Sequence, residues 1–179
     1  IWFDAHGDLN TPDTTLTQFF DGMPLAISVG WCHQELWQQI KKQPPIGEGH
    51  CLLVGAHDLD PEEKKNLLSS DILYSPPPEL ETPTFLEKLA ILRKRVSQVY
   101  LHIDLDVLLP EEAPGVDYLT PNGLSLGQLQ SAIDHIAERF SIAAAGVCAY
   151  NPEKDKEDRT LYSGMALIAQ LAQRGARPH

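Results

Sequence analysis

The chain begins with the run Ile1-Trp2-Phe3-Asp4-Ala5-His6-Gly7-Asp8-Leu9-Asn10-Thr11-Pro12. Residues 1–5 are mostly apolar and of the types that favour β-strands. The polar run that follows contains a glycine and ends in a proline, a combination that disfavours a helix. We therefore predict a strand at residues 1–5 that leads directly into a loop carrying the chemistry of the protein.

Strand-like and helix-like segments alternate along the rest of the chain. Compact apolar runs predict buried strands at residues 51–55, 99–107 and 142–150. Apolar residues at helical spacing predict helices at residues 84–97, 125–140 and 160–174, and Ser125 has the residue type of an N-cap. This alternation predicts a single α/β domain over residues 1–179, with a three-layer α/β/α architecture and a mostly parallel sheet.

Composition restricts the class of protein and its partners. Hydrophobic residues make up 42% and charged residues 22% of the chain, as in an ordinary globular domain. The 25 acidic residues outnumber the 14 Lys and Arg, and the net charge of -11 excludes nucleic acid and anionic membrane surfaces as partners. No apolar run reaches the roughly 18 residues of a membrane span. The cysteines Cys32, Cys51 and Cys148 form no CxxC pair, so we expect neither a disulfide framework nor a cysteine zinc site, and a cytoplasmic location.

Acidic and imidazole side chains alternate at two places in the sequence. Asp4, His6 and Asp8 are spaced so that an extended chain would place all three on one side. Asp104 and Asp106 alternate in the same way inside the strand predicted at residues 99–107. His102 stands one step earlier in that alternation. Since carboxyl ends of parallel strands meet at one edge of a sheet, we expect both groups to share one site there.

Several carboxylates at one site repel one another unless a cation neutralises them. Carboxylates with one or two imidazoles suit Mn²⁺, and bridging carboxylates allow two ions to bind side by side. The sequence therefore predicts a two-metal hydrolase.

Simpler interpretations remain open for each of these segments. Residues 4–8 are compatible with a solvated turn, and Asp104 and Asp106 with exposed positions at a sheet edge. Residues 60–63, Asp-Pro-Glu-Glu, have the pattern of an ordinary helix start. Cys148 lies in an apolar run and is predicted to be a core residue rather than a nucleophile.

Five segments resemble motifs of the arginase family, within the ureohydrolase superfamily that includes agmatinase and formiminoglutamase. They are residues 4–12 (DAHxDxNTP in the family), 54–63 (GxRDxDPxE), 102–106 (xDxDxxxP), 113–116 (APGV) and 123–125 (GGLS). His57 replaces the arginine of the second motif, and Pro110 lies close to the proline of the third. The segments follow the family's order, so the resemblance implies an arginase-like fold.

The resemblance implies a binuclear manganese centre. By position, Asp4 and Asp104 would bridge the ions, Asp8 would bind the first ion, and His6 and Asp106 the second. The implied reaction is the attack of a metal-bridging hydroxide on a guanidino or amidino carbon, which releases urea. Another histidine ligand of the family lies on an upstream segment outside these 179 residues. We therefore expect that the chain lacks the N-terminal part of the family's domain and one ligand of the first site.

The resemblance also implies contacts with the substrate. Asn10 would contact a substrate carboxylate, and Asp60 an α-amino group. Residues 17–24 align with the family segment SGNxHGxP, so Thr17 would contact the substrate. Asp21 aligns with the proton-shuttling histidine of that segment and is the candidate catalytic residue.

Departures from the family pattern leave a second class of function open. Asp21 replaces the histidine, Phe19 replaces a substrate-binding asparagine, and Ala149 replaces the glutamate of the EVNP segment that holds the guanidinium group. A catalytically degenerate family member that serves as a binding or oligomerisation module would fit these changes. A phosphoryl or acyl hydrolase is a third class, but the match of residues 54–63 argues against it. The resemblance also implies a homo-oligomer.

Overall fold

The structure is a computed structural model that describes residues 1–40 and 43–175. A single sheet of five parallel strands runs through it in the order β3-β2-β1-β4-β5. The strands are β1 (Trp2–Phe3), β2 (Leu52–Val54), β3 (Leu73–Ser75), β4 (Gln98–Asp104) and β5 (Ser141–Cys148). The predicted α/β class with a parallel sheet is confirmed.

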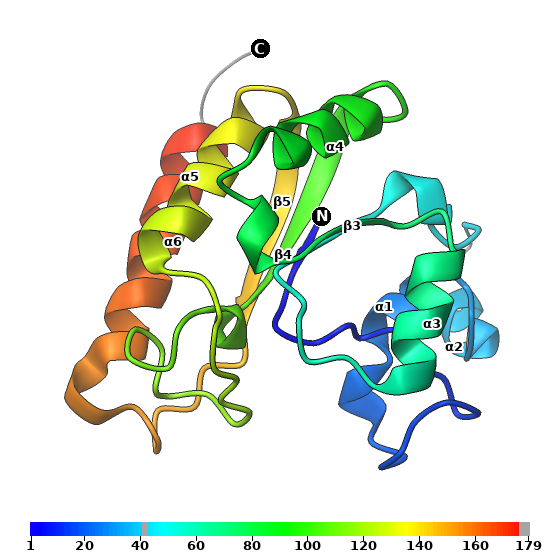
Figure 1. The fold of residues 1–179 in the computed structure, drawn as a ribbon, viewed down its shortest axis with the longest axis horizontal. Helices are drawn as coiled ribbons and strands as arrows, with labels where there is room; N and C mark the ends of the chain where they lie inside the picture. Colours follow the sequence, from blue (N-terminus) through cyan, green and yellow to red (C-terminus); the bar gives the residue numbers. More distant parts are fainter. Residues whose placement is uncertain (41–42, 176–179) are drawn as a thin grey trace.

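In the described residues, six α-helices and five short 3₁₀ turns connect or follow the strands. The helices are α1 (Pro24–Ser28), α2 (Gln34–Ile40), α3 (Pro61–Ser69), α4 (Pro83–Arg93), α5 (Leu126–Ala137) and α6 (Arg159–Gly175). The turns are η1 (Phe20–Gly22), η2 (Glu48–His50), η3 (Pro77–Glu79), η4 (Leu105–Val107) and η5 (Lys156–Asp158). Figure 1 shows α5 and α6 together along β4 and β5, with α1, α2 and α3 grouped around the other end of the sheet.

Two hydrophobic clusters make this a three-layer fold. The larger one joins inward side chains of β1, β2 and β4 to α4, α5 and α6, with Phe3, Leu101 and Ile133 fully buried in it. The smaller one joins the opposite face of the sheet to α1 and α3 through Leu53 and Leu67. Along β2, Leu52 and Val54 face the larger cluster and Leu53 faces the smaller one, so alternate residues of this strand face different helix layers.

Local signals in the sequence fix where helices begin. The Oγ of Ser125 accepts a hydrogen bond from the N–H of Gln128 at 3.2 Å, and Oε1 of Gln128 accepts one from the N–H of Ser125 at 2.9 Å. This capping box confirms Ser125 as the N-cap of α5. Asp60 caps α3 with Pro61 in its first turn, so the interpretation of residues 60–63 as a helix start is also correct.

The predicted strand at residues 99–107 is too long. β4 ends at Asp104, and the next residues form the turn η4. Oδ1 of Asp104 accepts a hydrogen bond from the N–H of Asp106 at 2.8 Å, which bends the backbone out of the sheet. β1 is also shorter than predicted, and the sequence analysis missed α2 and β3.

None of the helices in the described residues combines the length and the apolar character that crossing a bilayer requires.

Candidate metal centre

A polar cavity of about 490 Å³ lies where β1, β4 and β5 end. Ligands bind at this edge in parallel α/β sheets, because strand ends and the following loops converge there. All the side chains predicted from the sequence for the site line this cavity: Asp4, His6, Asp8, Asn10, Thr17, Asp21, Asp60, Asp104 and Asp106. The two groups of alternating residues therefore do share one site.

The loop after β1 is shaped by the carboxylates it carries. Oδ1 of Asp4 accepts a hydrogen bond from the N–H of His6 at 2.8 Å. The N–H of Ala5 donates to Oδ1 of Asp106 at 3.1 Å and so ties the loop to η4. Asp8 has a φ of 53°, in the left-handed region. The expectation that extended backbone aligns Asp4, His6 and Asp8 was wrong, because the strand ends before them and a turn brings them together.

His6 lies between two carboxylates. Its Nδ1 is 3.0 Å from Oδ2 of Asp106 and 3.3 Å from Oδ1 of Asp4. Burial lowers the pKa of His6, but hydrogen bonds to Asp106 and Asp4 outweigh it and raise the pKa to about 11. The three side chains offer ligand atoms within 4.8 Å of one another, a set that a divalent ion accepts.

A second set consists of Asp4, Asp8 and His102, again with ligand atoms within 4.8 Å of one another. Trp2 organises this set, since its Nε1 lies 3.2 Å from Oδ2 of Asp8 and 3.3 Å from Oδ2 of Asp4. The indole also stacks on the imidazole of His102, with ring centroids 3.6 Å apart. Trp2 and His102 are register partners across β1 and β4, which is why their rings meet. His102 does lie on the cavity side, as its place in the alternation predicted.

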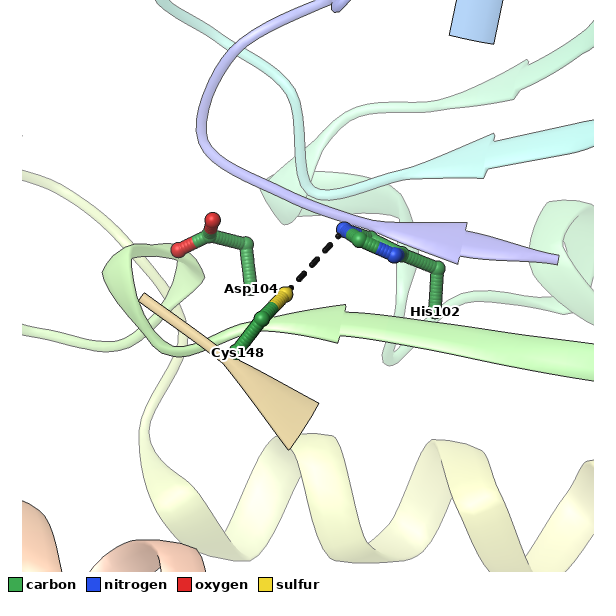
Figure 2. A group of neighbouring side chains, drawn as sticks. All are labelled: His102, Asp104 and Cys148. Atoms are coloured by element: carbon green, nitrogen blue, oxygen red, sulfur yellow. Dashed lines mark hydrogen bonds between the residues drawn. The ribbon is translucent and has the colours of Figure 1, made fainter. Parts of the chain in front are cut away.

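Cys148 contributes to the cavity, and its assignment to the core was wrong. It is half-buried at the end of β5, where it is the register partner of Asp104. Figure 2 shows His102, Asp104 and Cys148 converging from the two neighbouring strands. Sequence spacing could not have found this group, because the pairing of β4 and β5 creates it.

The electrostatics of the cavity call for a cation. Burial raises the pKa of Asp4, and burial together with the charges of Asp4 and Asp104 raises that of Asp8. Burial and the neighbouring charges of Asp106 and Asp4 raise the pKa of Asp104 to about 8. Within the described part of the chain, no lysine or arginine lines the cavity. Buried carboxylates with an imidazole and without a lysine or arginine beside them are the donor set of a divalent metal ion, so the side chains fit such an ion.

A polar wall stands beside the carboxylates. Nδ2 of Asn10 donates a hydrogen bond to Oδ2 of Asp60 at 3.0 Å, and the Oγ1 of Thr14 donates to Oδ1 of Asn10 at 3.0 Å. Thr17 and Asp21 lie at the exposed rim of the same wall. The candidate substrate residues therefore line the same cavity as the carboxylate cluster.

Glu63 supports this wall, and the sequence analysis did not assign it to the site. It is only 3% exposed, and its Oε1 accepts a hydrogen bond from the N–H of Leu9 at 2.9 Å. Its Oε2 accepts one from the N–H of Asp60 at 3.1 Å. A Cβ at Gly7 would clash with Oε1 of Glu63, so the loop approaches this carboxylate as closely as only glycine permits.

Known proteins are similar to this chain in sequence and share its fold. An arginase from Bacillus caldovelox is 35% identical over 96% of this chain and 58% of its own length, and an arginase from Bacillus subtilis is 32% identical over 96% and 59%. The chain thus spans less than two thirds of the length of these curated relatives. The crystal structure of the Bacillus caldovelox arginase superposes with a TM-score of 0.88 at 34% identity, covering 99% of this chain and 60% of that one.

The family comparison agrees with these likenesses. A family model described as the arginase family matches residues 1–173, which is nearly the whole chain. The parallel sheet, the carboxylate cavity and the sequence similarity agree, and we conclude that the chain belongs to the arginase family.

Proposed function

We propose that the cavity binds manganese and that the protein to which this chain belongs is a ureohydrolase acting on a small guanidino or amidino compound. Asp4 and Asp104 would bridge two ions, with Asp8 at the first ion and His6 and Asp106 at the second. The observation that supports this most is the cluster of buried carboxylates without a lysine or arginine in the described lining. Manganese ions in such a centre supply a Lewis acid and lower the pKa of nearby water.

The remaining side chains have the chemistry to bind and orient a zwitterionic substrate. Asn10 and Asp60 face each other at 3.0 Å, so an amide and a carboxylate are available for a substrate carboxylate and amino group. Thr17 adds a hydroxyl at the rim, and the carboxylate of Asp21 can accept or deliver a proton there. Phe19 and Tyr118 lie with ring centroids 6.1 Å apart and narrow the entrance that the substrate would use.

A degenerate family member that binds a ligand without turnover is the second candidate. It is favoured by Ala149, which lines the cavity with a methyl group where the family motif has a glutamate. Without that carboxylate, a guanidinium group lacks the anionic partner that the family motif provides. Asp21, which replaces the histidine of the family motif, also favours a family member without turnover.

Urea release separates the two candidates. The chain is loaded with Mn²⁺ and assayed against arginine, agmatine and other guanidino compounds, with the Asp4→Asn variant as the control. We expect urea from at least one compound, and none from the variant. Stoichiometric metal binding without urea from any compound would replace hydrolysis by the binding function.

A further inference from the structure

We infer that a mixed set of nitrogen, sulfur and oxygen ligands, formed by His102, Cys148 and Asp104, binds a divalent ion with affinity for thiolates, such as Zn²⁺. The inference deepens the proposed function and rests on it in one respect, because Asp104 belongs to both ligand sets. It goes beyond that function because it adds a sulfur ligand to a centre that the family resemblance describes with oxygen and nitrogen ligands alone.

The three ligand atoms converge from two adjacent strands. His102 and Asp104 are two residues apart on β4, so their side chains share one face of the sheet. Cys148 is the register partner of Asp104 on β5, which brings its thiol to the same face. Nδ1 or Nε2 of His102, Sγ of Cys148 and a carboxylate oxygen of Asp104 lie within 4.8 Å of one another (Figure 2).

The distance between nitrogen and sulfur matches a shared metal ion. Sγ of Cys148 and Nε2 of His102 are 3.4 Å apart. A tetrahedral zinc ion, with Zn–S of about 2.3 Å and Zn–N of about 2.0 Å, separates its sulfur and nitrogen ligands by about 3.5 Å. Both atoms could therefore bind one ion with little movement of either side chain.

The surrounding residues hold the imidazole in place. The Trp2 indole stacks on it at 3.6 Å with an interplanar angle of 11°, which fixes the plane of the ring. Gly146, the register partner of His102, has no side chain, and a Cβ there would meet the hydroxyl of Tyr100 rather than the imidazole. A ligand whose orientation is fixed by its neighbours binds a metal without losing much rotamer freedom.

The donor types select the ion. Thiolate and imidazole ligands favour Zn²⁺ and Co²⁺, whereas Mn²⁺ prefers carboxylates and water. On binding, the Cys148 thiol transfers its proton to solvent and forms the sulfur–metal bond, and neutral His102 donates a nitrogen lone pair. Three protein ligands leave one position of a tetrahedral ion open to water or substrate, as in catalytic zinc sites.

Cobalt provides a probe that reports the sulfur ligand directly. The chain is titrated with Co²⁺, and the sulfur-to-cobalt charge-transfer band in the near ultraviolet is followed in the wild type and in Cys148→Ser. The control is Cys32→Ser, because Cys32 is also a half-buried free cysteine but does not line the cavity. We expect a saturable band in the wild type and control, its loss in Cys148→Ser, and at least an about tenfold weaker affinity of that variant for Zn²⁺.

Mn²⁺ binding, measured by calorimetry on the same proteins, separates this inference from the proposed function. Cobalt binding without the charge-transfer band overturns the sulfur ligand and leaves the manganese centre standing. A band without any Mn²⁺ binding supports the mixed site and overturns the manganese centre. If no divalent ion binds at all, both fail.

X-ray absorption of the zinc-loaded wild-type chain tests the sulfur ligand without relying on a variant that must fold. We expect one sulfur neighbour at about 2.3 Å from zinc. A shell of oxygen and nitrogen neighbours only would overturn the inference.

Discussion

Asp104 is one of the cavity carboxyl groups whose pKa is raised by burial and by neighbouring negative charges. Burial and the negative charges of Asp106 and Asp4 raise its pKa to about 8, so without a cation its charge opposes folding. Its Oδ1 nevertheless accepts the N–H of Asp106, a bond that an asparagine side chain could also make. Function and stability therefore make opposite demands at this residue, as is common where charged groups gather at a binding site.

Replacing the Asp104 carboxylate should raise the stability of the metal-free chain and lower its affinity for Mn²⁺. In the presence of a chelator at pH 7, we expect Asp104→Asn to raise the free energy of unfolding by about 1–3 kcal/mol, because folding no longer has to protonate this buried carboxyl group and the turn is kept. Urea unfolding followed by circular dichroism measures this difference. The same variant should lose Mn²⁺ affinity, and a less stable metal-free variant would argue against the repulsion described here.

Replacing Ala149 tests whether a guanidinium group binds beside this position. It lines the cavity with φ of 63°. Ala149→Glu should place a carboxylate on the wall and strengthen the binding of guanidino compounds by about tenfold, since a charge-assisted hydrogen bond is worth roughly 1.5 kcal/mol or more. Calorimetry with arginine measures the gain, and Ala149→Gln is the matched neutral control. Equal affinities of the two variants would mean that no guanidinium group binds beside this position.

At the scale of elements, the first turn of α3 holds the loop after β1 and the polar wall of the cavity in place. Glu63 in its first turn is 3% exposed and accepts the N–H groups of Leu9 and Asp60. The helix start therefore fixes both the loop after β1 and the wall beside it. A local capping pattern, legible in the sequence, thus also shapes the binding cavity.

Neighbouring glutamates in this turn make a matched pair for a test. Glu63→Gln turns an amide N–H₂ toward a backbone N–H, so we expect a loss of about 1–3 kcal/mol in the free energy of unfolding. Glu62→Gln removes only an exposed ion pair with Lys65 at 3.1 Å, and its effect should stay within about 0.5 kcal/mol. Thermal or urea unfolding of both variants checks this. Equal losses would show that Glu63 does not organise the loop.

The elements that could be predicted from sequence are those with strong local signals. α5 combines a clear apolar stripe with the Ser125 capping box, and the structure confirms both. The end of β4 could not be predicted, because the side chain of Asp104 rather than any apolar pattern ends the strand. β3 (Leu73–Ser75) and α2 (Gln34–Ile40) were missed because both are short and neither is a compact apolar run like that at residues 51–55.

At the scale of the whole molecule, the proton balance of the cavity sets how stability depends on pH. An unfolded aspartate has a pKa of 3.8, whereas Asp104 has one of about 8 in the folded chain, so the folded state holds the extra proton between these values. Stability therefore falls as pH rises through this window. His6 acts with the same sign from 6.5 to about 11, because its protonated form is kept only when folded.

We therefore expect the metal-free chain to unfold at lower urea concentration at pH 8 than at pH 5.5. Saturating Mn²⁺ should reverse this trend, because the ion competes with protons for the same ligands. Unfolding midpoints measured at several pH values, with chelator or with Mn²⁺, test the statement. A midpoint that rises from pH 5.5 to pH 8 in chelator would contradict it.

The acidic residues of the site could be identified from the sequence, but the residues that surround them could not. Asp4, His6 and Asp8 are close in sequence, so their spacing and the family motif were sufficient to select them. Trp2 and Cys148 belong to the site through strand pairing over long sequence separations, and each looks like an ordinary apolar strand residue on its own. Contacts of that kind follow from the register of the whole sheet, which local patterns do not specify.

Mn²⁺ binding tests directly whether the carboxylates of this cavity form a metal centre. Mn²⁺ is titrated into the chelator-treated chain and into the double variant Asp4→Asn, Asp104→Asn, with binding followed by the electron paramagnetic resonance signal of free Mn²⁺. We expect saturable binding by the wild type and at least an about hundredfold weaker affinity in the double variant. Equal binding by the two proteins, or none by the wild type, would mean that these carboxylates do not form a metal centre.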